Sequence, residues 1–283
     1  MKVLVTGADG QLGQALQRAA GECVDHVFSF VGKKELDITD AAAVSLAVQG
    51  FDIVVNCAAY TNVEAAEDDE VSAAAVNTTG TANLAQAAAG ENALLIHIST
   101  DYVYGAGENT PISEDSLPQP LNVYGRSKWN GEKAVVAGGG RFIIIRTGWL
   151  FSLDGKNFVK TMLRLLAANK ELRIVSDQVG TPTFADDLAT IILGIIDEPS
   201  PTEGIYNYSN EGVCSWYDFA LAIAELSGSN SSILPCRSSE YICKAARPPF
   251  SVLDKTKIKT TYNLTIPHWY AALQRCMQNY RPE

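Results

Sequence analysis

Short, nearly continuous apolar runs recur along the first half of the chain, and helical segments separate them. One such helix, over residues 71–89, is rich in alanine. Unbroken apolar runs are typical of strands that are covered on both faces of a parallel sheet. The alternation therefore predicts an α/β fold, a doubly wound parallel sheet with helices on both sides, built from strands at residues 2–6, 24–31, 52–59, 93–99 and 141–146.

The pattern changes after about residue 150, where elements become shorter and less regular. A basic loop with two prolines occupies residues 244–251. We expect residues 1–150 to form the sheet domain, with residues of about 170–205 packing back onto it. Residues 151–283 should form a smaller C-terminal α/β region at the carboxyl edge of the sheet, where parallel α/β proteins bind ligands.

Composition narrows the possible functions. The 283 residues carry a formal net charge of −10, and no stretch concentrates Lys and Arg, so we expect no nucleic-acid partner. The six cysteines show no paired or metal-like spacing and read as reduced thiols. No apolar run reaches membrane-spanning length, and no signal segment precedes the first strand, so we expect a cytoplasmic protein without a membrane partner.

Three glycines follow the first strand at a spacing of three residues: Gly7, Gly10 and Gly13. A strand, a glycine-rich turn and a helix open a Rossmann-like dinucleotide-binding unit, in which backbone N–H groups approach a diphosphate. The spacing is GxxGxxG rather than GxGxxG, and a turn that uses glycine only for its geometry is the alternative. We expect Gly7, Gly10, Gln11 and Leu12 to contact the cofactor.

The end of the second strand bears on the choice of cofactor. An acidic residue there commonly binds the adenosine ribose, whereas this chain has Lys33 and Lys34. Two cations would attract a 2′-phosphate, so NADPH is at least as favoured as NADH, although a solvated surface turn explains the lysines equally well. Asp37 and Ile38 should flank the adenine, Thr39 or Asp40 should cap the next helix, and further cofactor contacts should follow the third strand, at Ala58, Ala59 and Tyr60.

The strongest candidate for chemistry is Tyr124-x-x-x-Lys128 at the start of a helix. Residues four apart share a helix face, so the ammonium can lie beside the phenol. One charge at ~4 Å supplies about 4 kcal/mol at an effective dielectric of ~20, which would lower the pKa of the phenol by about three units. An exposed Tyr/Lys pair without function is the alternative.

Ser99 and Thr100, at the end of the fourth strand, are placed to meet a carbonyl.

Taken together, GxxGxxG, Ser99-Thr100 and Tyr124-x-x-x-Lys128 resemble the extended short-chain dehydrogenase/reductase superfamily. More specifically, the chain resembles the dTDP-4-dehydrorhamnose reductase family. Six blocks in order along nearly the whole chain carry this resemblance: residues 7–13, 36–40, 99–104, 146–151, 180–183 and 247–253.

The resemblance implies an oxidoreductase of dTDP-rhamnose biosynthesis that reduces the C4 ketone of dTDP-4-dehydro-L-rhamnose to dTDP-L-rhamnose. Hydride would come from NADPH or NADH. Tyr124 would be the general acid, Lys128 would bind the nicotinamide ribose and lower the pKa of the phenol, and Thr100 would hydrogen-bond the ketone. The C-terminal region would be the nucleotide-sugar domain, with substrate contacts at Thr100, Asp101, Tyr102, Trp149 and Arg247.

Several of these residues also have a purely structural interpretation. Trp149 could be a core aromatic residue, Arg247 could pair with a surface carboxylate, and Asp101 could cap a turn. The three histidines are isolated in the sequence and read as structural residues. Some relatives hold Mg²⁺ at a dimer interface with an acidic residue in the first helix, but here residues 14–17 contain no carboxylate. We therefore expect no metal, and a monomer or homodimer.

Two other functions stay open. The beta subunit of methionine adenosyltransferase is similar to this family and acts as a cofactor-binding regulatory subunit. Nucleotide-sugar epimerases and dehydratases share the Tyr/Lys pair, although dehydratases usually have more acidic residues beside the Ser/Thr than Asp101 alone provides.

Overall fold

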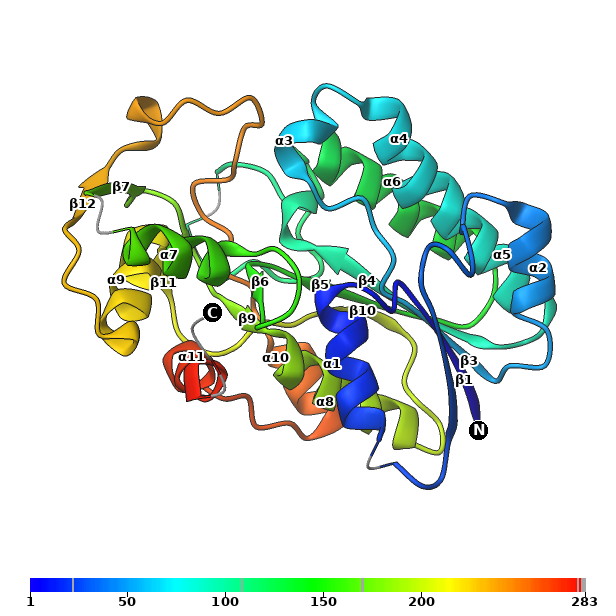
Figure 1. Ribbon diagram of the computed structural model, residues 1–283. Coiled ribbons are helices and arrows are strands. Elements are labelled where there is room, and N and C mark those ends of the chain that lie inside the picture. The colour runs from blue at the N-terminus through cyan, green and yellow to red at the C-terminus, as the bar shows by residue number, and fades with distance from the viewer. Residues whose placement is uncertain (22, 108, 169–170, 279, 281–283) are drawn as a thin grey trace.

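The structure, a computed structural model, describes residues 1–21, 23–107, 109–168, 171–278 and 280. Its centre is a parallel sheet of six strands in the order β10-β5-β4-β3-β1-β2 (Figure 1). This confirms the predicted fold class. The strands are β1 (Lys2–Thr6), β2 (Val27–Val31), β3 (Ile53–Asn56), β4 (Leu94–Thr100), β5 (Phe142–Thr147) and β10 (Gly204–Asn207).

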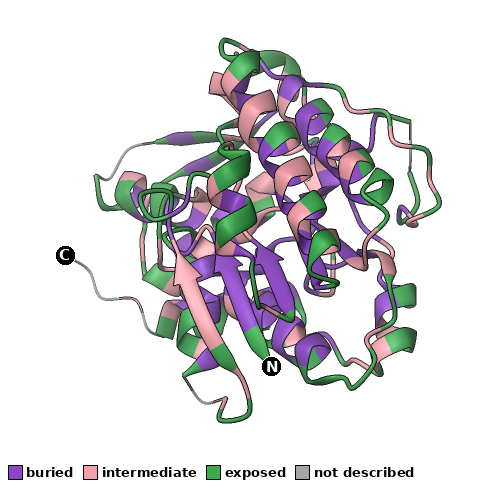
Figure 2. Cartoon of the chain, turned by 90° about the vertical axis from the view of Figure 1, so that its right-hand side faces the viewer, coloured by how far each residue is buried: buried purple, intermediate pink, exposed green. Residues whose placement is uncertain are grey.

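Helices cover both faces of the sheet because its strands are apolar on both sides. Val3 and Val5 pack toward one face and Leu4 toward the other. The first face is covered by α1 (Gln11–Ala20), α8 (Ala185–Asp197) and α10 (Thr256–Tyr262). The second is covered by α2 (Ala41–Ala47), π-helix η1 (Ala75–Gly80), α5 (Thr81–Gly90) and α6 (Val123–Ala137), and α4 (Glu70–Ala74) packs on η1 and α6. The central strands are accordingly buried along most of their length (Figure 2).

The single helix expected over residues 71–89 is interrupted by the π-helix η1. Asn77 lies in this π segment, where its side chain accepts a hydrogen bond from Tyr60 N (2.8 Å) and donates to Ser127 Oγ (2.9 Å). A Cβ atom on Gly131 would lie 2.3 Å from Asn77 O, so α6 approaches this segment closely. The π-helix thereby joins the loop after β3 to α6, and such turns are frequent beside functional sites.

The rest of the chain forms a smaller region at the carboxyl edge of the sheet. Phe151, Phe219 and Trp269 lie in its separate core. It contains three two-stranded pairs: β6 (Leu150–Phe151) with β9 (Thr183–Phe184), β7 (Leu172–Val175) with β12 (Ile233–Cys236), and β8 (Val179–Gly180) with β11 (Cys214–Ser215). Its helices are α7 (Phe158–Ala167), α9 (Trp216–Ser227), α11 (Trp269–Gln278) and the 3-10 turn η3 (Ser238–Glu240). Two short elements belong to the first half of the chain instead: α3 (Val63–Ala66) and the 3-10 turn η2 (Asp101–Val103).

Candidate active site

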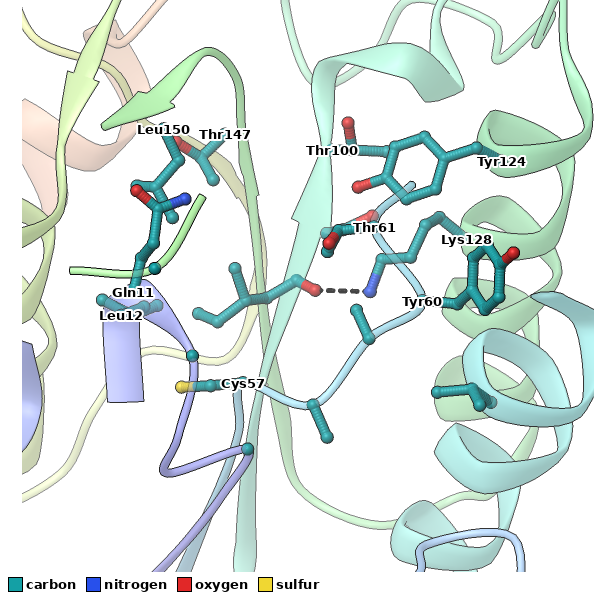
Figure 3. A pocket seen from close by; sticks show the side chains of 18 of the residues that line it. Gln11, Leu12, Cys57, Tyr60, Thr61, Thr100, Tyr124, Lys128, Thr147 and Leu150 are labelled. Atoms are coloured by element: carbon teal, nitrogen blue, oxygen red, sulfur yellow. Dashed lines mark hydrogen bonds between the residues drawn. The ribbon is translucent and has the colours of Figure 1, made fainter. Parts of the chain in front are cut away.

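A cavity of about 770 Å³ lies where the carboxyl ends of β1, β3, β4 and β5 meet the C-terminal region. Segments far apart in the sequence converge on it (Figure 3). All the residues expected at the cofactor line this one cavity: Gly7, Gly10, Gln11, Leu12, Asp37, Ile38, Ala58, Ala59, Tyr60, Tyr124 and Lys128. Four of the five expected substrate residues line it as well: Thr100, Asp101, Tyr102 and Trp149.

The glycine loop has the geometry that its spacing predicted. Gly7 adopts φ +70°, and a Cβ atom there would lie 2.5 Å from Ala58 N. A Cβ atom on Gly13 would lie 2.3 Å from Gly7 O, so this glycine lets α1 pack against the turn. Gly10 lines the cavity as the N-cap of α1 and makes no side-chain cap. The first N–H groups and the positive dipole end of α1 thus face the cavity, an arrangement that fits a diphosphate.

Charges of both signs surround the end of β2. Lys33 lines the cavity, whereas Lys34 is not among its lining residues. Glu35 accepts a hydrogen bond from Gly32 N (2.9 Å), and a Cβ atom on Gly32 would lie 2.2 Å from a carboxylate oxygen of Asp9. Two carboxylates, Asp9 and Glu35, therefore lie near the end of β2, where Lys33 reaches the cavity.

The helix after this loop begins as expected. Asp40 is its N-cap and accepts hydrogen bonds from the backbone N–H groups of Ala42 and Ala43, both at 3.0 Å. Of the two caps considered, the structure selects Asp40. Asp37 instead accepts two hydrogen bonds from Thr39, which keep its carboxylate fixed at the cavity edge.

Tyr124 and Thr100 lie side by side in the cavity (Figure 3). Asn122 caps α6 by accepting a hydrogen bond from Gly125 N (2.8 Å), and this fixes Tyr124 in the first turn of the helix. Burial raises the pKa of Tyr124 to about 12, and the Asp101 carboxylate raises it further, while a hydrogen bond with Thr100 opposes the rise. The phenol is therefore protonated at neutral pH.

Burial outweighs any lowering by Lys128, since the net pKa of Tyr124 is raised, and the predicted effect of the lysine on this phenol stays a prediction. The Lys128 ammonium is directed at the sheet, where it donates a hydrogen bond to Ile98 O at 2.7 Å (Figure 3). Only 2% of Lys128 is exposed. Burial lowers the pKa of Lys128 to about 8, against the opposing effects of Glu132 and Cys57.

Asp101 is a buried carboxylate beside Thr100. Thr100 Oγ1 donates to one of its oxygens (3.1 Å), and the other oxygen, Oδ2, has no hydrogen-bond partner among the described residues. Burial raises the pKa of Asp101 to about 6. Thr100 itself caps the turn η2 by accepting from Tyr102 N, so the turn-capping role considered for Asp101 belongs to its neighbour.

Trp149 is held by a second tryptophan that was not predicted from the sequence. Trp149 and Trp216 stack with their ring centroids 3.5 Å apart and an interplanar angle of 7°, and both line the cavity. Ser215 and Asp218 form a capping box that fixes Trp216 as the first residue of α9. The S-x-x-D pattern marks the start of this helix in the sequence, but it carries no information on which side of the helix meets the cavity. Lys156 and Asn157 also line the cavity and were not predicted, because nothing in the local sequence indicates that they face it.

Arg247 is not among the residues that line the cavity, so its expected direct contact with substrate is not supported. Its guanidinium donates to Glu64 Oε1 at 2.8 Å, which is the ion pair considered as the alternative. It also forms a hydrogen bond with the Tyr102 side chain. Arg247 thus contacts Tyr102, which lines the cavity, without being a lining residue itself.

The described residues offer neither a metal centre nor a membrane-spanning helix. Within the described ranges, no group of three or more His, Cys, Asp or Glu side chains is arranged to hold a metal ion. No helix in the same part of the chain combines the length and apolar character that crossing a bilayer requires.

Comparisons with known proteins agree with this geometry. A family model described as "RmlD substrate binding domain" matches residues 1–282. The spore coat polysaccharide biosynthesis protein SpsK of Bacillus subtilis is 40% identical over 98% of this chain and 97% of its own. A dTDP-4-dehydrorhamnose reductase of Mycolicibacterium smegmatis is 40% identical over 96% and 84%, respectively. The crystal structure of the Bacillus anthracis dTDP-4-dehydrorhamnose reductase in complex with NADP superposes with a TM-score of 0.94, at 36% identity and 99% coverage of both chains. The chain therefore belongs to the dTDP-4-dehydrorhamnose reductase family.

Proposed function

We propose that this protein reduces the C4 ketone of dTDP-4-dehydro-L-rhamnose to dTDP-L-rhamnose with NADPH or NADH. The observation that carries the proposal is the convergence of Thr100, Tyr124 and Lys128 on the cavity that the glycine loop also lines. A ketone reduction needs a hydroxyl donor, an acid and a dinucleotide site within one pocket, and this cavity combines all three.

The residues present fit a nicotinamide dinucleotide. Gly10 and the first turn of α1 would hold the diphosphate, Asp37 and Ile38 the adenosine, and Lys128 the nicotinamide ribose. Ala58, Ala59 and Tyr60 would line the path between them. When bound, the cofactor supplies a hydride to the carbonyl carbon.

The side chains of this protein stabilise the charge on the ketone oxygen and supply the proton. Negative charge develops on the ketone oxygen, and the Thr100 hydroxyl can stabilise it with a hydrogen bond. Tyr124 then gives its proton to that oxygen. A phenol with a pKa of about 12 keeps its proton at neutral pH, yet it is far more acidic than the alcohol that forms, so transfer is favourable. The raised pKa is thus compatible with Tyr124 as general acid and incompatible with Tyr124 as a resting phenolate.

The substrate would lie between the two parts of the chain. Asp101 and Tyr102 come from the sheet side, while Trp149, supported by Trp216, faces them from the other. We assign residues 1–150 to the cofactor and residues 151–283 mainly to the nucleotide sugar. Arg247 would act on this site through Tyr102 rather than by direct contact.

An assay of cofactor consumption tests the proposal. The purified protein should oxidise NADPH or NADH when given dTDP-4-dehydro-L-rhamnose and should leave both cofactors intact without a 4-keto sugar nucleotide. A panel of related 4-keto nucleotide sugars measures how strictly base and sugar are recognised. Tight cofactor binding without turnover, together with stable association with a larger enzyme, would favour the regulatory function instead. Water elimination or epimerisation of a nucleotide sugar, with no net cofactor oxidation, would favour the dehydratase or epimerase.

Cofactor preference can be tested at the end of β2. Lys33→Ala should weaken binding of NADPH more than binding of NADH, because only Lys33 reaches the cavity where a 2′-phosphate would lie. Loss of one cation from such a contact is worth about 1–2 kcal/mol, or roughly a tenfold rise in the Kd of NADPH. Lys34→Ala removes an equal charge outside the cavity and is the matched control. Equal losses of affinity for NADPH and NADH in Lys33→Ala would show that this lysine does not bind the 2′-phosphate.

Assembly and location remain predictions. We expect no bound metal. We also expect a monomer or homodimer, and size-exclusion chromatography with light scattering can decide between the two. A cytoplasmic location follows from the proposed substrates, since a nucleotide sugar and NAD(P)H are both supplied there. No partner other than the nucleotide sugar is needed for the reaction.

A further inference from the structure

A chain of polar side chains runs through the sheet behind Lys128. Lys128 Nζ lies 3.3 Å from His97 Nε2, and the other ring nitrogen, His97 Nδ1, lies 3.1 Å from Asn56 Nδ2. Asn56 Oδ1 accepts hydrogen bonds from Ala58 N (3.0 Å) and Thr6 Oγ1 (2.8 Å). His97, Asn56 and Thr6 are almost fully buried.

These contacts determine where the imidazole carries its proton. A backbone N–H can only donate, so the oxygen of the Asn56 amide must face Ala58 and its NH₂ group must face His97. His97 Nδ1 therefore accepts a hydrogen bond and has no proton. Burial and the nearby Lys128 hold the pKa of His97 well below its usual range, so the ring is neutral. A neutral ring without a proton on Nδ1 must carry it on Nε2, facing Lys128.

An N–H group directed at an ammonium is a donor facing a donor, which disfavours the charged form of the lysine. The neutral amine has no such conflict, since its lone pair can accept from His97 Nε2–H while one N–H still donates to Ile98 O. We propose that His97 is a positioning residue that presents Nε2–H to Lys128 and thereby favours the uncharged amine. The catalytic consequence rests on the proposed function, whereas the charge state of Lys128 does not.

The other groups around Lys128 do not remove this effect. Glu132, one turn further along α6, favours the ammonium, but its carboxylate is already bound by Arg146 at 2.7 Å and by Ser99 at 2.5 Å. Cys57, at the end of β3, has a pKa raised to about 12 by burial and is a neutral thiol. Tyr124, on the same helix as Lys128, is a neutral phenol. Burial by itself lowers the pKa of Lys128 to about 8, and the contact with His97 Nε2–H would act in the same direction.

The consequence for the reaction is a lysine that exchanges its proton near neutral pH. After Tyr124 has protonated the product, its phenolate must regain a proton. A Lys128 ammonium that is disfavoured by its surroundings gives up a proton more readily than an ordinary lysine does. Turnover should therefore fall as pH rises through the pKa of Lys128, because the amine form has no proton to supply.

The protonation states of His97 and Lys128 can be measured without any substrate. Long-range ¹H–¹⁵N NMR spectra distinguish the two neutral tautomers of histidine, and the chain has three histidines, so the signals are few. We expect His97 to stay neutral with its proton on Nε2 between about pH 6 and 9. Lysine labelled with ¹³C at Cε should show Lys128 titrating near 8, below the value of about 10.4 for an unperturbed lysine. A proton on Nδ1, a charged imidazole or an ordinary pKa for Lys128 would overturn the proposal.

Variants then test the cause. In His97→Gln, the amide can turn its oxygen toward Lys128 and accept from the ammonium, so the pKa of Lys128 and the alkaline limb of the kcat profile should rise by about one to two pH units. Asn56→Asp should accept a hydrogen bond from Nδ1–H and leave Nε2 free to accept, which gives a visible switch of tautomer; its negative charge also favours the ammonium, so the pKa of Lys128 should change in the same direction. Thr6→Val is the matched control: Ala58 N still fixes the Asn56 amide, so the pKa of Lys128 should not move.

The outcomes separate this inference from the proposed function. If the folded His97→Gln or Asn56→Asp protein leaves the pKa of Lys128 unchanged, His97 does not control it and the inference fails. If the tautomer and the titrations are as expected but no 4-keto nucleotide sugar is reduced, the charge relation stands and the proposed function fails.

Discussion

Tyr124→Phe should fold normally, bind the cofactor with nearly unchanged affinity and lose about 10²–10⁴-fold in kcat, the range that a positioned general acid contributes. The substitution removes one hydroxyl from a buried ring whose packing is otherwise kept. Because Thr100 and the cofactor site remain, hydride transfer stays possible, but the new oxyanion has no acid beside it. Steady-state kinetics with dTDP-4-dehydro-L-rhamnose measures the loss, and titration of the cofactor by fluorescence checks that its site is intact.

Tyr102→Phe is a matched control for this experiment. Its ring contacts that of Tyr124 edge to face, with centroids 5.8 Å apart, so both variants lose a phenol hydroxyl in the same part of the cavity. The Tyr102 hydroxyl bonds Arg247 instead of Thr100, so its removal should raise KM more than it lowers kcat. Near-normal turnover of Tyr124→Phe, or equal losses of kcat in the two variants, would remove Tyr124 from its proposed role.

The pH profile supports the same assignment with a defined sign. The acid form of Tyr124 is present below its pKa of about 12 and is lost only above it. Any fall in kcat between pH 7 and 10 must therefore come from another group, and Lys128, with a pKa of about 8, is the candidate. A limb near 8 that disappears in Tyr124→Phe, which forms no phenolate for Lys128 to reprotonate, would agree with this division.

Much of the fold could be predicted because its first half obeys local rules. Continuous apolar runs give strands β1 to β5, and GxxGxxG after β1 gives a turn whose close contacts only glycine allows. The last strand of the sheet, Gly204–Asn207, was not among the strands predicted for it. A run of four residues contains no information about its neighbours, and this strand pairs with β5 and packs against α10.

The sequence predicted that the motif residues meet at one edge of the sheet. It did not predict the contacts that these residues make with segments far away in the chain. Helical spacing places Lys128 on the same face as Tyr124, but it cannot show that a carbonyl on β4 binds the ammonium. Arg247 is paired with Glu64, 183 positions earlier in the chain. Likewise, nothing in the sequence around Trp216 indicates that it stacks on Trp149.

A second large effect is expected beneath the site, where Arg146→Met should lower the free energy of unfolding by about 3–5 kcal/mol at neutral pH. Arg146 and Glu132 form an ion pair of 2.7 Å with both side chains 3% exposed. Arg146 also donates to Tyr104 Oη at 2.7 Å. Methionine fills much of the space but leaves the Glu132 carboxylate buried without its cation, and chemical denaturation measures the cost.

The loss should depend on pH in a specific direction. Without Arg146, the Glu132 carboxylate is buried with no cation beside it, and it can lose this charge only by binding a proton in acid. Protonation should therefore relieve the destabilisation as pH falls. The difference between Arg146→Met and the unmodified protein should therefore be smallest near pH 4 and largest at neutral pH.

Two further variants separate the ion pair from a general effect of losing arginine. Arg141→Met removes an arginine from an exposed pair with Glu203, whose side chains are 41% and 43% exposed, and should cost at most about 1 kcal/mol. Replacing both buried partners, as in Glu132→Leu with Arg146→Met, should recover most of the stability, because no uncompensated charge remains. If Arg146→Met costs no more than Arg141→Met, the buried pair does not hold α6 to β4 and β5. The positions of Tyr124 and Lys128, both on α6, would then depend on apolar packing and on other polar contacts of this helix, such as those of Asn77 and Asn122.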